Sequence, residues 1–227
     1  MIRLVLFLFL LAPMAVYAQN TVTIDGDIMD WYDEFILDDP QGCDDDPGQK
    51  DVVVAGAAVA MPNIFLLFFF DVEGLNGMNT GDGCWLVDID GNGNADKALC
   101  FTLRGNPFTL MAADVVFYDC NNSQNDRCSG SMAVAEPSLN CALDAQAAEI
   151  PGHECGGGNG SAVECSVSLS AIGWVSGTSV VLSSCSFPSA VPNSAPSDCV
   201  SDADIPIVVD PDTGETTPVT LLQFGIE

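Results

Sequence analysis

Apolar and polar residues alternate along much of the chain, as in β-strands that bury one face. Residues 163–169, VECSVSL, alternate without an error and predict a half-buried strand. Residues 64–70, IFLLFFF, are apolar on both faces and predict a central strand, because such a strand would promote aggregation at a sheet edge. Strands are expected at 51–60, 64–72, 84–89, 98–103, 108–118, 163–169 and 180–186, separated by turn sequences such as MPN and RGNP.

Helical signals are few. Residues 138–149 are rich in alanine and could form one short helix, which Pro151 and the glycines after it would end. From residue 188 the chain is rich in Pro, Ser and Asp, which indicates a poorly packed tail, with a possible last strand at 219–226. We therefore expect an all-β fold: an antiparallel, jelly-roll-like β-sandwich over residues 19–190, cross-linked by disulfides, and an acidic tail over 191–227.

The first residues indicate export. Arg3 precedes an unbroken apolar run at residues 4–11, and VYA at 16–18 places small residues at a cleavage site. The alternative, a membrane anchor, would need about 20 apolar residues, and the run is shorter. We predict a signal peptide at residues 1–18, no membrane span, and a secreted, extracellular or cell-surface protein of a bacterium.

Charge narrows the class of partner. Removing residues 1–18 leaves 209 residues with 4 basic against 32 acidic side chains, a formal charge of −28. A protein with this balance repels nucleic acids and anionic membrane surfaces and concentrates cations around itself. Nucleic-acid binding is therefore excluded, although an acidic excess can also serve solubility alone.

All ten cysteines lie after the predicted signal peptide, and an even number in an exported chain indicates disulfides. The chain has no Cys-x-x-Cys pair and a single histidine, which argues against a Cys/His zinc site or haem attachment. Local loops would be closed by Cys120–Cys128 and Cys185–Cys199. The sequence alone does not pair Cys43, Cys141, Cys155 and Cys165.

The stretch DIDGNGNAD, residues 88–96, alternates oxygen-bearing and small or apolar residues. Calcium takes six to eight oxygen ligands, and carboxylates and amide carbonyls supply them. We expect a calcium ion here, held by Asp88, Asp90, Asn92, Asn94 and Asp96. The alternative is a solvated hairpin turn, because Asp, Asn and Gly are also favoured in turns.

The loop matches the first half of an EF-hand, but the twelfth position, where an EF-hand has a bidentate glutamate, is Leu99. We therefore expect a strand–loop–strand hairpin instead. Cys84 and Cys100 are each eight residues from Asn92, so a simple hairpin centred there places them opposite each other. Directly opposed residues lie about 4.5–5.5 Å apart at Cβ, which predicts a Cys84–Cys100 disulfide.

The segment VTIDGDIMDW, residues 22–31, resembles the opening "IDG…DW" of secreted bacterial β-sandwich modules related to family-9 carbohydrate-binding and DOMON-like domains. DVVVAGAAVAMPNIFLLFFFDVEG looks like their second and third strands, and CWLVDIDGNGNAD like the strand and acidic loop that follow. VECSVSLSAIG is similar to their late E-x-x-(V/I)-P-L-S strand, except that Ser168 stands where proline is usual. The resemblance covers roughly residues 20–190.

This resemblance implies a calcium-stabilised β-sandwich that binds a glycan or another small ligand without catalysis. Sugar-binding members clamp the ligand between exposed aromatic rings, and no such clamp can be matched here. Trp85, beside the acidic loop, and Trp174, after a strand end, are the candidates for stacking on a sugar, with core packing as the alternative for both. Trp31 belongs to the DW motif and is expected beneath the sheet.

Catalytic signals are weak. His153, in the glycine-rich PGHECGGGNG, is the one imidazole and is expected in a surface loop. Asp212 begins a single DTG, whereas aspartic proteases need two facing aspartates, so a turn is expected. Residues 38–51, DDPQGCDDDPGQKD, are expected to be a solvated loop, with a second calcium site as the alternative.

We therefore expect a non-enzymatic, secreted, calcium-stabilised module that presents a loop surface to a glycan or an extracellular protein. The alternative is a structural or adhesive surface protein in which calcium and disulfides harden the fold. A hydrolase is the third possibility.

Overall fold

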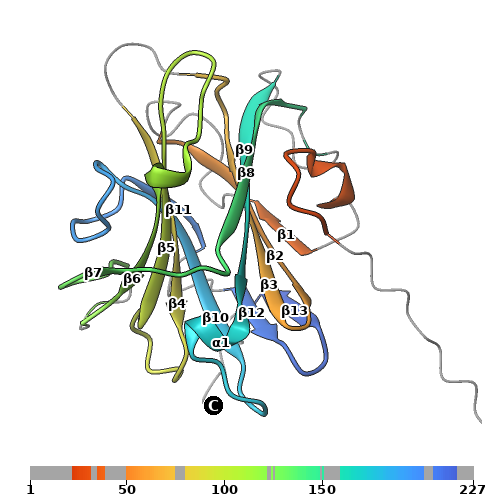
Figure 1. Ribbon diagram of the computed structural model, residues 1–227, viewed down its shortest axis with the longest axis vertical. Helices are drawn as coiled ribbons and strands as arrows, with labels where there is room; N and C mark the ends of the chain where they lie inside the picture. The colour runs from red at the N-terminus through yellow and green to blue at the C-terminus, as the bar shows by residue number, and fades with distance from the viewer. Residues whose placement is uncertain are drawn as a thin grey trace, which may run out of the picture.

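Two antiparallel sheets stacked face to face form the protein (Figure 1). The computed structural model describes residues 22–31, 35–38, 50–74, 80–121, 124, 126–148, 150, 159–201 and 207–218. The first sheet, sheet A, has the strand order β1-β2-β3-β9-β8. Its strands are β1 (Phe35–Asp38), β2 (Val52–Ala60), β3 (Asn63–Phe70), β8 (Asn140–Ala147) and β9 (Gly160–Ser168).

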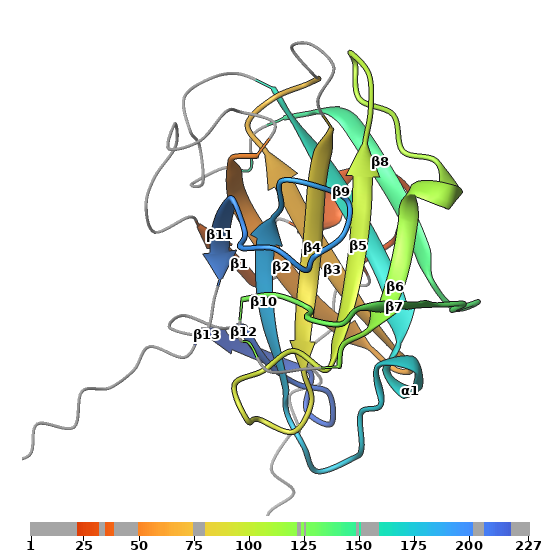
Figure 2. The same cartoon turned by 90° about the vertical axis from the view of Figure 1, so that its left-hand side faces the viewer.

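The second sheet, sheet B, has the order β13-β12-β10-β4-β5-β6-β7, and β11 also pairs with β10. Figure 2 views the molecule from the side of this sheet. Its strands are β4 (Gly81–Asp88), β5 (Lys97–Leu103), β6 (Val115–Asp119), β7 (Met132–Val134), β10 (Val180–Ser186), β11 (Asp198–Ser201), β12 (Ile207–Asp210) and β13 (Glu215–Pro218). The expected all-β sandwich is confirmed.

Helical structure in the described part of the chain is limited to three short elements: η1 (Ile28–Trp31), η2 (Ala112–Asp114) and α1 (Leu169–Ile172). Ser168 ends β9 and caps α1, because its side chain accepts a hydrogen bond from the Ala171 N–H at 3.2 Å. None of the described helices is long and apolar enough to cross a membrane.

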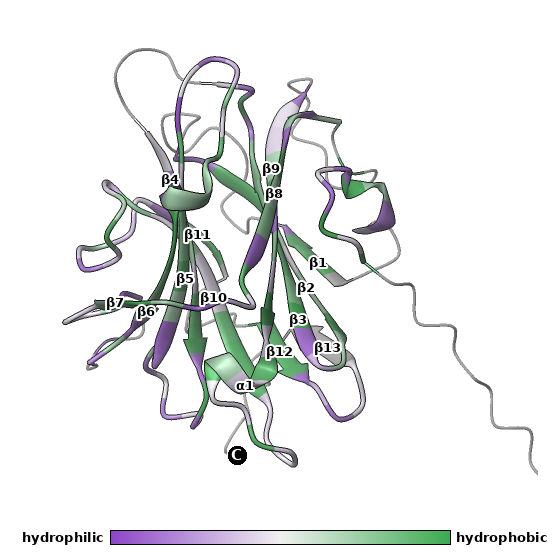
Figure 3. Cartoon of the chain, in the orientation of Figure 1, coloured by the Kyte–Doolittle hydropathy of each residue, from purple (hydrophilic) through white to green (hydrophobic). Residues whose placement is uncertain are grey.

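The main core lies between the sheets, where Figure 3 shows the strands as predominantly hydrophobic and the loops as more polar. Phe68 is at its centre and packs against Phe70, Trp85 and Phe101, with ring centroids 4.9, 5.6 and 5.1 Å from its own. These tilted and edge-to-face contacts stabilise the stacking of β3 against β4 and β5.

A second, smaller core covers the outer face of sheet A. Leu67 and Phe69 of β3 point to this face, and Val22, Ile28 and Trp31 of the N-terminal segment are buried against it. Strand β3 is therefore central and covered on both sides, as IFLLFFF predicted. For β9 the prediction of a half-buried strand is wrong, because its polar residues Glu164 and Ser166 are buried as well.

Three predicted disulfides are present: Cys84–Cys100, Cys120–Cys128 and Cys185–Cys199. Cys84 and Cys100 are paired directly in the register of β4 and β5, with a Cα–Cα distance of 4.1 Å. A fourth disulfide, Cys141–Cys165, joins β8 to β9. Cys43 and Cys155 lie outside the described residues.

The predicted helix over 138–149 is wrong, because residues 140–147 form strand β8, which pairs with β9 and is bonded to it through Cys141–Cys165. Alanine favours helices only weakly, and pairing with a neighbouring strand overrides that preference. The strand expected at 108–118 begins only at Val115, since a turn at 104–109 and η2 precede it.

The poorly packed tail expected from residue 188 is wrong for the described residues 198–201 and 207–218. They form β11, β12 and β13 of sheet B, and Val200, Ile207 and Val209 are buried in the main core. The sandwich therefore extends beyond residue 190. The possible strand at 219–226 and the predicted signal peptide lie outside the described residues.

Candidate metal centre

The acidic loop connects β4 to β5 at one end of the sandwich, at the bottom of Figures 1 and 2. It is a strand–loop–strand hairpin, and Leu99, the residue at the twelfth EF-hand position, is buried in β5. The Cys84–Cys100 disulfide joins the two strands that carry the loop. A rigid base of this kind limits how far the loop can spread when its carboxylates repel one another.

Short side-chain hydrogen bonds shape the loop. Asp88 accepts from the Gly91 N–H with one carboxylate oxygen and from the Gly93 N–H with the other, both at 2.8 Å. Asp96 accepts from the Ile89 N–H at 2.8 Å. Gly91 and Gly93 have φ angles of 70° and 83°, a left-handed conformation that residues with a side chain rarely adopt. The two glycines thus allow the loop to curl around Asp88.

Three carboxylates converge in this loop. Asp88, Asp90 and Asp96 each offer one oxygen, and these oxygens all lie within 4.8 Å of one another. Oxygen ligands of one calcium ion lie about 2.3–2.6 Å from it, so two of them can be at most about 5 Å apart. The separation therefore fits a single cation, and the donors are the hard oxygens that calcium prefers.

Electrostatics favours a cation at the same place. Burial raises the pKa of Asp88, its two backbone hydrogen bonds lower it, and the charges of Asp96 and Asp90 raise it further. The Asp88 side chain is thus held where its negative charge is poorly solvated and repelled by two neighbours. A bound cation would relieve both effects.

The two asparagines of the predicted ligand set are less clearly engaged. The Asn92 side-chain oxygen accepts from the Asn94 N–H at 2.9 Å. The Asn92 N–H donates to Asp90 at 3.1 Å. These bonds are those of a well-formed turn, so ligation by Asn92 and Asn94 stays a prediction.

The loop between α1 and β10 lies beside the acidic loop. A Cβ atom on Gly173 would be 3.4 Å from Cδ1 of Ile89, so the two loops are in van der Waals contact. Trp174 follows Gly173, is partly buried, and donates its indole N–H to the Thr178 carbonyl at 2.7 Å. This hydrogen bond ties the ring to its own loop, which lies beside the acidic loop.

Asp212 holds the same loop from the other side. Its carboxylate accepts from the Ser176 hydroxyl at 2.9 Å and from the Gly177 N–H at 2.6 Å. The DTG sequence lies in the turn between β12 and β13, as expected, and its aspartate stabilises the neighbouring loop.

The prediction that Trp85 stacks on a sugar is corrected by the structure. The Trp85 side chain is 0% exposed in the main core, and its indole N–H donates to the Leu67 carbonyl at 3.2 Å. A ring enclosed between two sheets cannot stack on a glycan, so the prediction that Trp85 binds a ligand is wrong. Trp31 is also fully buried, as expected. Of the two tryptophans predicted to stack on a sugar, only Trp174 stays a candidate. His153 and most of residues 38–51 lie outside the described residues.

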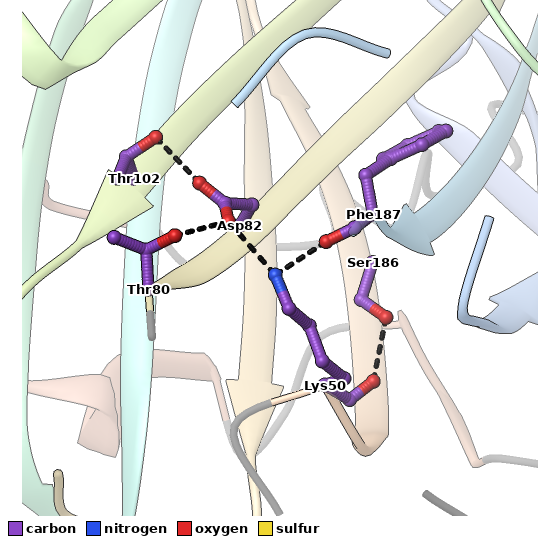
Figure 4. A network of polar contacts seen from close by, with 6 residues as sticks. All are labelled: Lys50, Thr80, Asp82, Thr102, Ser186 and Phe187. Carbon is purple, nitrogen blue, oxygen red and sulfur yellow. Dashed lines mark hydrogen bonds and ion pairs between the residues drawn. The ribbon is translucent and has the colours of Figure 1, made fainter. Parts of the chain in front are cut away.

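Sequence reasoning missed a buried ion pair (Figure 4). The Lys50 ammonium lies 2.8 Å from the Asp82 carboxylate, which also accepts from the hydroxyls of Thr80 and Thr102 at 2.6 and 2.7 Å. Lys50 donates in addition to the Phe187 carbonyl. The network joins Lys50, two residues before β2 of sheet A, to β4, β5 and the residue that follows β10 in sheet B. The sequence offered one signal for this ion pair: Lys50 is one of only five basic residues in a strongly acidic chain.

Every basic side chain in the described part of the chain is paired with an aspartate. Besides Lys50–Asp82, the pairs are Lys97–Asp119, Arg104–Asp114 and Arg127–Asp126. The described surface therefore offers no unpaired positive side chain to an anionic ligand, which favours neutral or cationic ones.

Comparison with known proteins adds no relative: no protein-family model, curated protein or solved structure matches the chain.

Proposed function

We propose that this protein is a secreted, non-catalytic binding module whose loop surface is organised by calcium at Asp88, Asp90 and Asp96. The observation that carries the proposal is the convergence of three carboxylate oxygens within 4.8 Å on a disulfide-braced hairpin. The disulfides suit an oxidising compartment, where exported proteins fold.

The ligand side of the proposal rests on the loop next to the ion. Trp174 lies in the loop beside the acidic loop, and an indole face can stack on a sugar ring. A neutral glycan also agrees with the pairing of all described basic side chains. We propose a glycan as the ligand and Trp174 as its stacking residue.

Thermal unfolding in calcium and in chelator tests the metal. Calcium at about 100 times its dissociation constant should stabilise the protein by about 2.7 kcal/mol, or roughly 5–10 °C for a chain of this size. Asp90→Asn should abolish most of this response, since it removes a charge yet keeps the oxygen that accepts from the Asn92 N–H. Asp27→Asn is the matched control, because exposed Asp27 accepts from the Met29 N–H in the same way.

An unchanged melting temperature in calcium and chelator would refute the metal. For the ligand, binding of the calcium-loaded protein to a glycan array should be lost in Trp174→Ala and kept in Val175→Ala, whose side chain is exposed next to it. Equal binding by both variants would remove Trp174 from the proposal.

A structural or adhesive role is the second candidate, and edge strand β7 favours it. Its residues Met132 and Val134 are exposed at the end of sheet B, and exposed edge strands promote association between chains. Concentration-dependent self-association that Val134→Lys prevents, together with silence on glycan arrays, would select this role.

A further inference from the structure

A carboxyl group is enclosed beneath the N-terminal segment, far along the chain from the acidic loop. Glu164 of β9 is 0% exposed on the outer face of sheet A. One of its oxygens accepts from the Trp31 indole N–H at 2.7 Å and the other from the Gly26 N–H at 2.9 Å. Both donors belong to residues 22–31, so this one side chain fastens the whole segment to the sheet.

The segment fits closely over that face. Val22, Ile28 and Trp31 are buried against Leu67 and Phe69, which would otherwise face water. At Gly26, which has a φ of 84°, an added Cβ atom would lie 3.0 Å from the Leu143 carbonyl oxygen of β8. In Figure 1 the segment, in red, lies outside sheet A, on the side away from sheet B.

The charges around Glu164 are all negative. Asp25 and Asp30 of the segment act on it electrostatically, and Asp27 is the remaining acid there. Opposite Glu164, the paired residues are Leu67 of β3 and Ala142 of β8, and the charged residue of β8 is Asp144. The described basic side chains are each paired with other aspartates. One Asp30 oxygen is buried and has no hydrogen-bond partner among the described residues.

We propose that Glu164 makes residues 22–31 a proton-controlled cover, which is held firmly over sheet A while Glu164 is protonated and is loosened when it ionises. An ionised Glu164 beneath the closed segment is desolvated and close to Asp25 and Asp30. Lifting the segment exposes the carboxylate to water and moves both aspartates away. The open state therefore gains on the closed state as the pH rises, and the apolar outer face of sheet A becomes accessible.

The size of the effect follows from the two pKa values. Burial, with the charges of Asp30 and Asp25, raises the pKa of Glu164 to about 7 in spite of its two hydrogen bonds, whereas an exposed glutamate titrates at 4.5. Relative to the protonated protein, opening is favoured about 4-fold at pH 5 and about 290-fold at pH 8, so the open population rises about 70-fold between them.

Exchange of the indole N–H groups with solvent tests the proposal in the full chain. Trp31 and Trp85 are both 0% exposed and both donate a hydrogen bond, but Trp85 lies in the main core and reports on opening of the whole sandwich. The rates are measured by NMR on protein labelled with ¹⁵N-tryptophan, and the Trp31 rate is divided by the rate of a free tryptophan indole to remove the intrinsic pH dependence of exchange. This ratio should rise about 70-fold from pH 5 to pH 8. Trp31 should also exchange faster than Trp85, which shows that it exchanges by lifting of the segment and not by opening of the whole sandwich.

Glu164→Gln should leave that ratio within about threefold over the same range, and Glu136→Gln, the control in the loop between β7 and β8, should keep the rise. A constant ratio in the unmodified protein, or a rise that persists in Glu164→Gln, would overturn the proposal. If Glu164→Gln does not fold, ¹³C titration of the Glu164 carboxyl in the unmodified protein decides: a midpoint of 6 or above supports the cover, and one below 6 refutes it. The readout is independent of calcium, so it separates this proposal from the metal centre.

Discussion

The buried Lys50–Asp82 pair leads to a prediction whose size can be worked out from the structure. Asp82 is 1% exposed and Lys50 is 12% exposed, so neither charge is well solvated. Asp82→Asn keeps the shape of the side chain but removes the charge that faces the ammonium. Leaving one charge of a buried pair uncompensated costs about 3–5 kcal/mol.

In Asp82→Asn the Lys50 ammonium still contacts some solvent and donates to the Phe187 carbonyl. We therefore expect a loss of stability at the lower end of that range, about 3 kcal/mol. Domains of this size lose roughly 2–4 °C of melting temperature per kcal/mol, so the melting temperature should fall by roughly 6–12 °C. Asp119→Asn is the matched control. It breaks the Lys97–Asp119 pair, whose side chains are 24% and 40% exposed, and exposed pairs contribute only about 0.2–1 kcal/mol.

Calorimetry or urea unfolding of the two variants, with the unmodified protein beside them, measures the difference. The double variant Lys50→Met with Asp82→Asn should recover part of the loss, since no charge is then stranded. If Asp82→Asn costs no more than Asp119→Asn, the two charges of the buried pair are solvated in the folded protein, and the network does not join the sheets as inferred.

Three further predictions concern other parts of the fold. Replacing Cys84 and Cys100 by alanine removes a link that closes a 16-residue separation; chain-entropy loss predicts about 3 kcal/mol of destabilisation in urea and weaker calcium binding by titration calorimetry. Since burial raises the pKa of Asp88, protons compete with the cation, and the calcium-dependent rise in melting temperature should grow from pH 4 to pH 7; Asp88→Asn should remove most of this growth, and an unchanged pH profile in that variant would place the ion elsewhere. The raised pKa of Glu164 makes folding bind a proton, so metal-free protein should lose stability as the pH rises from 4.5 to about 7, and Glu164→Gln should reduce that slope in urea unfolding.

The parts of the fold that could be predicted depend on neighbours in sequence. The hairpin around Asn92 followed from symmetry because both of its strands and both of its cysteines lie within a few residues of the turn. Strand β3 could be placed at the centre because seven consecutive apolar residues need cover on both faces. The local sequence of the hairpin includes both of its paired strands, and the local sequence of β3 shows that both of its faces must be covered.

Most of the errors concern partners that are distant in the sequence. The sequence predicts a helix in place of strand β8, because its alanines do not reveal β9, to which Cys141–Cys165 binds it. Strands β11 and β12 have only four residues each within a stretch rich in Pro, Ser and Asp, and they are ordered by pairing with β10. Trp85 alternates along its strand, so it had to lie on one face or the other, and only the stacking of the sheets decides which face is buried.

The candidate site was predictable to the same extent. The sequence contained the three aspartates and their spacing, but their convergence depends on how the loop curls, with Asp88 at its centre. The alternation of residues 163–169 predicts that the Glu164 side chain faces solvent. Its burial depends on a segment more than 130 residues earlier, and no periodicity within β9 reports on that segment.

The two groups with raised pKa values show how this acidic chain manages charges that its few basic residues cannot neutralise. Asp88 stands in a loop open to solvent with other carboxylates around it, so a cation can enter and replace the proton. Glu164 is enclosed beneath the N-terminal segment, where burial and the charges of Asp30 and Asp25 favour a proton in spite of its two hydrogen bonds. Calcium should therefore raise the melting temperature at pH 7 without slowing the exchange of the Trp31 indole N–H. If calcium slows Trp31 alone, the ion acts at the N-terminal segment, and the division between the two sites is wrong.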